Sequence, residues 1–115
     1  MGKDKANILQ GTLNLLVLKT LDTMGSMHGW GIAKRIEQVS KDLLELKYGT
    51  LYPALMNLEQ RGWISSEWGT SENNRRAKFY ELTPQGERRL ERERERWLEH
   101  TLAVSRLLEL RLRLP

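Results

Sequence analysis

The apolar positions of this chain follow a helical period at first, then a strand period, and then a helical period again. Between residues 7 and 24 they recur every three or four residues, which predicts a helix that Gly25 ends. Additional leucines widen the apolar stripe of this helix almost all the way round. Such a helix must be covered on more than one side, which its own domain can do alone or together with a second chain.

Two more helices are predicted before the strand-like part of the chain. The first spans residues 27–38, with Ile32 and Ile36 facing the core. The second lies within residues 47–64, KYGTLYPALMNLEQRGWI, whose opening is aromatic, rigid and nearly uncharged. Its expected buried stripe consists of Leu51, Leu55 and Leu58, and its small, polar row consists of Thr50, Ala54, Asn57 and Arg61.

Three residues predict where this third helix begins and ends. Thr50 is the expected N-cap, because a threonine side chain can accept a hydrogen bond from a free backbone N–H group. Pro53 would then lie in the first turn, where its missing N–H would have had no partner. Gly62 is expected to end the helix.

A β-hairpin with a basic tip is predicted next. Residues 63–68 and 78–83 each alternate between two faces in the manner of strands, with Ile64, Ser66 and Trp68 sharing one face. Residues 69–77, GTSENNRRA, are rich in turn formers and end with positive charge. We therefore expect a hairpin with a long, polar and positive loop.

A single long helix is predicted for the rest of the chain. Thr83 is expected to cap it and Pro84 to occupy its first position. About 30 residues of helix would extend ~45 Å, further than so small a body can cover. The charged run between residues 87 and 99 is interpreted mainly as a solvated face. The apolar stripe of this helix consists of Leu90, Trp97, Thr101, Val104 and Leu108.

This order of elements predicts the fold class and the domains. Three short helices followed by a basic hairpin are typical of a winged helix-turn-helix. We expect a mainly α fold with a small β-hairpin, in which residues 1–83 form a winged helix-turn-helix DNA-binding domain. Residues 84–115 are expected to form a C-terminal dimerisation helix.

Composition narrows the function chiefly by exclusion. The 115 residues suffice for one domain, and the absence of cysteine excludes disulfides and thiolate metal sites. No apolar run approaches the ~20 residues that span a bilayer, and the first ten residues contain no signal-peptide core, so we expect a cytoplasmic protein. No nucleophile–base set, phosphate-binding glycine loop or metal-ligand cluster is recognisable, so we expect neither an enzyme nor a bound cofactor or metal.

Several of these segments together resemble the PadR-like family of transcriptional regulators. The motifs that carry the resemblance are His28-Gly29-Trp30, the GTLYPAL run at 49–55, Leu58-Glu59 with the RGWI run at 61–64, and the KFYELT run at 78–83 with Gly86. The resemblance extends over residues 8–90 or so, and the single terminal helix looks like that of the family's short subgroup. It implies a dimeric DNA-binding repressor, and members of the family often respond to aromatic small molecules.

The expected partner is double-stranded DNA, with the third helix in the major groove and the hairpin, as the wing, on the adjacent backbone or minor groove. The residues expected to contact DNA are Lys47, Thr50, Tyr52, Pro53, Asn57 and Arg61 on the helix, with Asn74, Arg75, Arg76 and Lys78 on the wing. Asn57 can read adenine with both ends of its amide, and arginine on the wing suits phosphates. The alternatives are that Tyr48 and Tyr52 are core aromatics and that the basic loop is merely solvated.

A homodimer is the other expected assembly. Its interface is predicted to contain Leu9, Leu13, Leu90, Trp97, Thr101, Val104 and Leu108. Trp97 has two interpretations: a buried anchor of the dimer, or a stacking wall for an aromatic effector that releases the repressor from DNA. The predicted function is a sequence-specific transcriptional regulator, and the alternative is a winged-helix adaptor that binds another protein without sequence-specific DNA binding.

Overall fold

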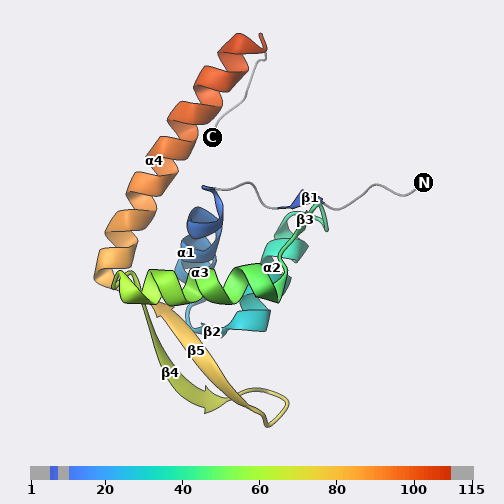
Figure 1. Ribbon diagram of the computed structural model, residues 1–115, viewed down its shortest axis with the longest axis vertical. Helices are drawn as coiled ribbons and strands as arrows, with labels where there is room; N and C mark the ends of the chain where they lie inside the picture. The colour runs from blue at the N-terminus through green and yellow to red at the C-terminus, as the bar shows by residue number, and fades with distance from the viewer. Residues whose placement is uncertain (1–5, 8–10, 110–115) are drawn as a thin grey trace, which may run out of the picture.

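The computed structural model describes residues 6–7 and 11–109, while residues 1–5, 8–10 and 110–115 lie outside this description. The elements in chain order are β1 (Ala6–Asn7), α1 (Leu13–Met24), β2 (Met27–His28), α2 (Gly29–Val39), β3 (Leu44–Glu45), α3 (Tyr48–Gln60), β4 (Ile64–Thr70), β5 (Arg76–Leu82) and α4 (Pro84–Leu107). The first three helices form a body, from which the β4–β5 hairpin and α4 project in opposite directions (Figure 1). This arrangement confirms the predicted mainly α fold with a small hairpin and a long last helix.

The strands belong to two sheets. In the larger sheet β5 lies between β2 and β4, and both of its neighbours are antiparallel to it. The hairpin pairs from Ile64 with Leu82 at its base to Thr70 with Arg76 at its tip. The smaller sheet is a parallel pairing of β1 with β3.

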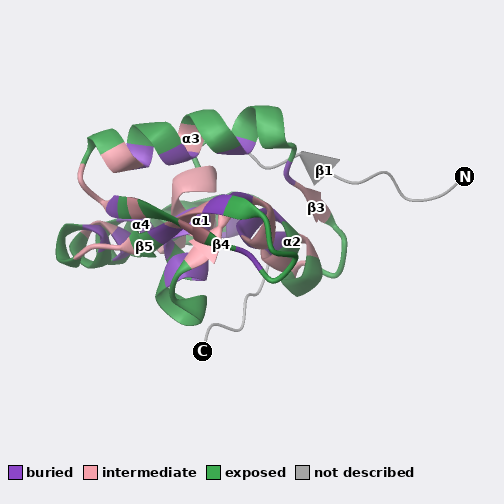
Figure 2. Ribbon diagram, turned by 90° about the horizontal axis from the view of Figure 1, so that it is seen from below, coloured by how far each residue is buried: buried purple, intermediate pink, exposed green. Residues whose placement is uncertain are grey.

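The hydrophobic core lies where the three helices of the body meet the base of the hairpin. Leu51, Leu55 and Leu58 of α3 are fully buried, as their spacing predicts. The remaining buried apolar residues of the cluster are Val17, Leu18, Leu21, Ile32, Ala33, Ile36, Leu46, Ile64, Tyr80 and Leu90. Burial of one such leucine contributes about 1.5–3 kcal/mol, so the three leucines attach α3 firmly to the body and turn its opposite face outward (Figure 2).

Several predicted element ends are confirmed. Gly25 and Gly62 have φ values of 79° and 78°, in the left-handed region that glycine tolerates best, and they end α1 and α3. Thr83 caps α4, because its Oγ1 accepts a hydrogen bond from the N–H of Gly86 at 3.0 Å. Pro84 occupies the first position of that helix.

The helix predicted over residues 7–24 is wrong at its start. α1 begins only at Leu13, because Gly11 has a φ of 93° and interrupts any helix that would include it. Residues 6–7 form β1 instead of helix. Leu9, which was expected in the dimer interface, lies outside the described residues.

The second helix also begins later than predicted. Met27 and His28 form β2, opposite Tyr80 and Phe79 of β5, and α2 starts at Gly29. His28 caps α2, since its Nδ1 accepts a hydrogen bond from the N–H of Gly31 at 3.0 Å. Its imidazole also stacks on Trp30, with the ring centroids 3.6 Å apart. Burial lowers the pKa of His28, which keeps Nδ1 available as an acceptor.

The prediction that Thr50 caps α3 is wrong. The N-cap is Lys47, whose carbonyl oxygen accepts hydrogen bonds from the N–H groups of Thr50 and Leu51 at 3.0 and 2.9 Å. Thr50 is therefore the third residue of the helix, and Pro53 lies beyond the first turn. Without an N–H, Pro53 cannot donate to the carbonyl of Gly49 one turn earlier, so that carbonyl is left open on the exposed start of α3.

The long loop predicted at the tip of the hairpin is wrong as well. The strands continue further than expected, so the loop contains only residues 71–75. Ser71 closes it: its backbone N–H donates to the carbonyl of Arg75 at 2.8 Å, and its carbonyl accepts from the N–H of Asn74 at 2.9 Å. Asn74 adopts a φ of 59°, a conformation that asparagine tolerates better than most residues, so it has a role in the turn itself.

The last helix is shorter than predicted and more closely packed at its start. It ends at Leu107 instead of continuing to the end of the chain, and Glu109 follows with a φ of 57°. Leu90, which was expected in the dimer interface, is buried in the core of its own chain. Glu93 lies within the run interpreted as a solvated face, but it is only 8% exposed and accepts hydrogen bonds from Arg89 at 2.7 and 2.9 Å.

The start of α4 is joined to the end of α3 by close backbone contact. The N–H of Thr83 donates to the carbonyl of Trp63 at 3.1 Å, and the Thr83 hydroxyl donates to the carbonyl of Gly62 at 2.6 Å. A Cβ on Gly86 would lie 1.9 Å from the Trp63 carbonyl oxygen. Position 86 therefore has no space for a side chain.

We expect Gly86→Ala to destabilise the fold by at least the ~3 kcal/mol at the upper end of overpacking costs, because the added methyl group meets a backbone atom that cannot move aside. Thermal or urea unfolding measures this change. Gly49→Ala is the control: nothing lies within 4 Å of its Cβ position, so stability should stay level or rise by ~0.5–1 kcal/mol. Equal stability of the two variants would contradict the described junction.

The cap on α2 predicts a dependence of stability on pH. The pKa of His28 in the folded chain is below the 6.5 of an unperturbed histidine, so its contribution is present above pH 6.5 and is lost as the pH falls through the folded pKa. We expect His28→Asn, whose amide oxygen can cap at any pH, to remove this part of the decline, about 1 kcal/mol for one cap. His100→Asn, at an exposed position of α4, should leave the decline unchanged. The measurement is urea unfolding of both variants between about pH 5 and 7.5.

Candidate nucleic-acid interface

The outward face of α3 gathers the residues predicted to contact DNA. All six of these positions on the helix and at its cap are exposed: Lys47, Thr50, Tyr52, Pro53, Asn57 and Arg61. The face is small and polar around Thr50 and Asn57, and it also carries Met56, whose side chain is 63% exposed. Because the leucine stripe holds the opposite side of α3 in the core, this face is presented whole to the outside (Figure 2).

The two tyrosines at the start of α3 differ in environment. Tyr48 is 55% exposed, so its interpretation as a core aromatic is wrong. Tyr52 is 39% exposed, but its hydroxyl end packs on α2, where a Cβ on Gly29 would lie 2.7 Å from the Tyr52 oxygen. Burial, followed by the nearby Tyr48, raises the pKa of Tyr52, so the hydroxyl stays protonated at neutral pH. Tyr52 thus combines a packing role with an exposed ring edge.

Asn57 and Arg61 are joined by a hydrogen bond. The Nε of Arg61 donates to the Oδ1 of Asn57 at 2.8 Å, across one turn of the helix. The guanidinium of Arg61 also lies over the indole of Trp63, 5.1 Å from the ring centroid. The amide that was predicted to read adenine is therefore held by a neighbouring side chain.

Glu59 ties α3 to the hairpin. Its carboxylate accepts a hydrogen bond from the hydroxyl of Ser66 on β4 and forms an ion pair with Lys78 on β5, with an N–O distance of 3.6 Å. Lys78, predicted to contact DNA, is thus partly neutralised by its own chain. The contact also fixes the hairpin relative to the helix.

The hairpin presents two free arginines and an exposed tryptophan near its tip. Arg75 and Arg76 are both exposed, and Arg76 lies over the indole of Trp68 at 4.6 Å. Trp68 is 59% exposed, although it shares a face of the strand with the buried Ile64. The difference arises because the hairpin extends past the body, so its outer half has nothing to pack against (Figure 1).

Sequence reasoning missed Met56 and Trp68 as part of this surface. Met56 follows Leu55 directly, and its position relative to Leu51, Leu55 and Leu58 on a helical wheel already directs it outward. Trp68 gave no comparable signal, because strand alternation predicts which face a residue lies on and not whether that face is covered.

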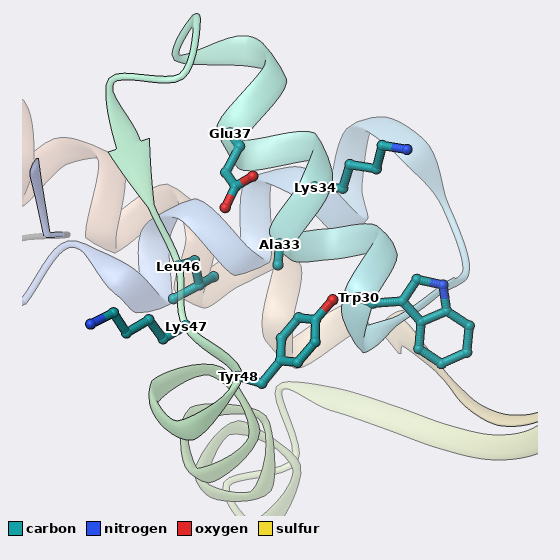
Figure 3. A pocket seen from close by; sticks show the side chains of 7 residues that line it. All are labelled: Trp30, Ala33, Lys34, Glu37, Leu46, Lys47 and Tyr48. Carbon is teal, nitrogen blue, oxygen red and sulfur yellow. The ribbon is translucent and has the colours of Figure 1, made fainter. Parts of the chain in front are cut away.

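A surface groove of about 490 Å³ lies between α2 and the segment that enters α3. Its lining residues are Trp30, Ala33, Lys34, Glu37, Leu46, Lys47 and Tyr48. Figure 3 shows Trp30 and Tyr48 beside each other, while the ammonium groups of Lys34 and Lys47 extend outward on different sides. Trp97, the residue predicted to contact an effector, is not part of this groove.

Beyond its packed start, α4 exposes apolar side chains. Trp97 is 42% exposed, Val104 39% and Leu108 61%, and Thr101 is half-buried. Leu13 of α1 is half-buried against the core. The helix extends away from the body over this part of its length (Figure 1).

Two kinds of site are absent from the described residues. Within ranges 6–7 and 11–109, no group of three His, Cys, Asp or Glu side chains could hold a metal ion. None of the helices in the described part of the chain combines the length and apolar character needed to cross a membrane.

Comparison with known proteins agrees with the fold and with the motifs. The sequence model of the transcriptional regulator PadR-like family matches residues 17–92. A transcriptional regulator from Clostridium thermocellum is similar in structure with a TM-score of 0.77 and 29% identity, covering 84% of this chain and 93% of that one. A PadR family transcriptional regulator from Eggerthella lenta has a TM-score of 0.74 and 29% identity, covering 89% and 86%.

A third similar structure is a PadR family transcription regulator from Clostridium difficile, with a TM-score of 0.72 and 28% identity over 84% of this chain and 98% of that one. Among curated protein sequences, none matches the chain.

Proposed function

The chain belongs to the PadR-like family of DNA-binding transcriptional regulators, and we propose that it acts as a homodimeric repressor that binds a two-fold symmetric DNA site. As a member of a family of transcriptional regulators, it is not an enzyme. The single observation that carries the proposal is the outward face of α3, whose small and polar residues lie opposite a fully buried leucine stripe.

The major groove is the proposed place for α3. A helix enters it with base-reading residues on one free face, and that face here carries Thr50, Pro53 and Asn57. Asn57 has the amide that pairs with the N6 and N7 atoms of adenine. Pro53 and Met56 offer apolar surface to thymine methyl groups, and Lys47 at the helix cap suits a phosphate.

The hairpin is the proposed wing, and its charges differ in availability. Arg75 and Arg76 are free to meet phosphates or the minor groove, whereas Lys78 already pairs with Glu59. Asn74 shapes the turn that presents both arginines. The larger electrostatic contribution is therefore assigned to the two arginines.

A second copy of the chain is the proposed cover for the exposed part of α4. The apolar side chains of Trp97, Val104 and Leu108 lie where the chain's own body does not reach, and burying such a stripe is favourable. We accordingly assign DNA binding to residues 1–83 and dimerisation to residues 84–115. The two copies of α3 would then read half-sites about one helical turn, ~34 Å, apart or a multiple of it.

Repression would follow from occupation of the site, which blocks the polymerase. An aromatic effector bound between the two arms, beside Trp97, would change the spacing of the two α3 helices and release the DNA. Trp97 as a dimer anchor and Trp97 as an effector wall are both compatible with its partial exposure.

The test of this function is selection of duplexes from a random DNA pool by the purified protein at ~150 mM salt, near physiological ionic strength. Recovery of a two-fold symmetric sequence with fixed half-site spacing supports the proposal. Weak binding of every sequence, with a steep dependence on salt, contradicts it and favours the adaptor that binds another protein.

We expect Arg75→Ala to weaken binding to all sequences alike, because its guanidinium is proposed to contact a phosphate. The slope of log affinity against log salt should decrease in magnitude by about 0.9, the value for one phosphate contact. Binding titrations at several salt concentrations measure the slope. Arg92→Ala removes an equal charge from an exposed position on α4 and should leave it unchanged. An unaltered slope for Arg75→Ala would make the wing assignment wrong.

We expect Asn57→Ala to lose discrimination at one base pair of each half-site, by ~1–3 kcal/mol, because the bidentate amide contact disappears. Competition between the selected site and single-base variants measures this. Gln38→Ala, which removes an amide from an exposed position on α2, is the matched control. Equal loss at every base pair would indicate that Asn57 does not read a base.

A further inference from the structure

We propose that Arg61 is a positioning residue that fixes the orientation of the Asn57 amide and links it, through the indole of Trp63, to Arg89 and Glu93 on α4. The proposal rests on the proposed function, in which Asn57 reads a base. It changes the role of Arg61 from the direct DNA contact predicted from the sequence to control of specificity from outside the interface.

The first step concerns the amide of Asn57. Its oxygen and nitrogen ends have nearly the same shape, so an unconstrained amide can turn either end toward a base. Adenine presents a donor at N6 beside an acceptor at N7, and only one amide orientation matches this pair. The hydrogen bond from Arg61 Nε to Asn57 Oδ1, at 2.8 Å, selects one orientation. It leaves both N–H groups and one lone pair of the oxygen free for the base.

The second step concerns Arg61 itself, which is exposed and would otherwise move among many rotamers. Its guanidinium lies 5.1 Å from the centroid of the Trp63 indole, and this contact restricts the side chain. A restricted arginine loses less entropy when it holds Asn57. The indole therefore supports the orientation of an amide to which it is not bonded.

The third step connects Trp63 to the arm. Arg89 of α4 lies over the same indole at 4.6 Å, so two guanidinium groups share one ring. Arg89 is in turn held by Glu93, with N–O distances of 2.7 and 2.9 Å, and Glu93 is only 8% exposed. A buried carboxylate with one cationic partner keeps that partner in place, because the carboxylate would be costly to leave unpaired.

Together these contacts form a continuous path from the arm to the base-reading amide. The Trp63 carbonyl accepts a hydrogen bond from the N–H of Thr83 at 3.1 Å, so the backbone at the start of α4 holds the same residue. A rotation of α4 would move Arg89 relative to the indole and thereby alter the support for Arg61. Specificity and arm position are coupled in this way without any contact between α4 and DNA.

The experiment compares Arg61→Met with Arg61→Gln. Methionine fills the space but cannot donate, whereas glutamine can still donate an N–H to Asn57 from one turn away without the charge. The readouts are the affinity ratio between the selected site and the same site changed at the base pair read by Asn57, and the salt slope. We expect Arg61→Met to lower the ratio by about threefold to tenfold, the effect of one hydrogen bond, and to keep the slope.

Arg61→Gln should retain most of the ratio. If instead Arg61→Met flattens the slope by about one unit and leaves the ratio unchanged, Arg61 contacts a phosphate directly and the proposal is overturned.

The link to the arm has its own variants. Arg89→Met combined with Glu93→Leu removes both charges together and leaves no unpaired carboxylate, and Arg89→Lys keeps the ion pair but loses the flat guanidinium. We expect both to lower the ratio as Arg61→Met does, with dimer mass and circular dichroism unchanged. Arg92→Met, at an exposed position of α4, is the control and should have no effect. An unchanged ratio in Arg89→Lys would overturn the link through Trp63.

The outcome for Asn57→Ala separates the two proposals. If Asn57→Ala leaves every ratio unchanged, base reading by Asn57 fails and the role of Arg61 fails with it. If Asn57→Ala lowers the ratio and Arg61→Met does not, only the positioning role fails.

Discussion

The contact between the start of α4 and the carbonyl of Trp63 is the constraint on which the geometry of this molecule depends. Trp63 directly follows the end of α3, Thr83 directly follows β5, and Gly86 leaves the two segments no space for an intervening side chain. The recognition helix, the wing and the arm therefore share one junction. None of the three can change direction without altering the same few backbone atoms, and interiors packed this closely resist gradual deformation.

Glu59 adds a second connection between the same parts, on the opposite side of the hairpin base from the core. Its contacts with Ser66 and Lys78 are partly exposed, so each contributes only about 1 kcal/mol or less to stability. Their effect is on orientation, because the hairpin would otherwise be attached to the body mainly by its apolar base. A wing held in place before DNA arrives loses less entropy on binding.

The parts of the fold that could be predicted from sequence are those determined by local chemistry. The spacing of Leu51, Leu55 and Leu58, and the Thr83-Pro84 start of α4, define their elements without information from elsewhere. β2 could not be predicted, since two residues become a strand only because β5 lies beside them. The cap at Lys47 uses no side-chain hydrogen bond, and the burial of Glu93 depends on how α4 packs against the rest of the fold. In the candidate site the exposed positions followed from periodicity, but the partners of Arg61, Arg76 and Lys78 did not.

The division of α3 into a buried stripe and a free face also bears on how such a protein evolves. Its three leucines supply the attachment, while Thr50, Pro53 and Met56 make little contact with the core. Substitutions at these outward positions can change the preferred DNA sequence at small cost to folding. A duplicated copy could therefore acquire a new set of target genes before it needed any compensating change in its interior, and divergence of target would proceed faster than divergence of fold.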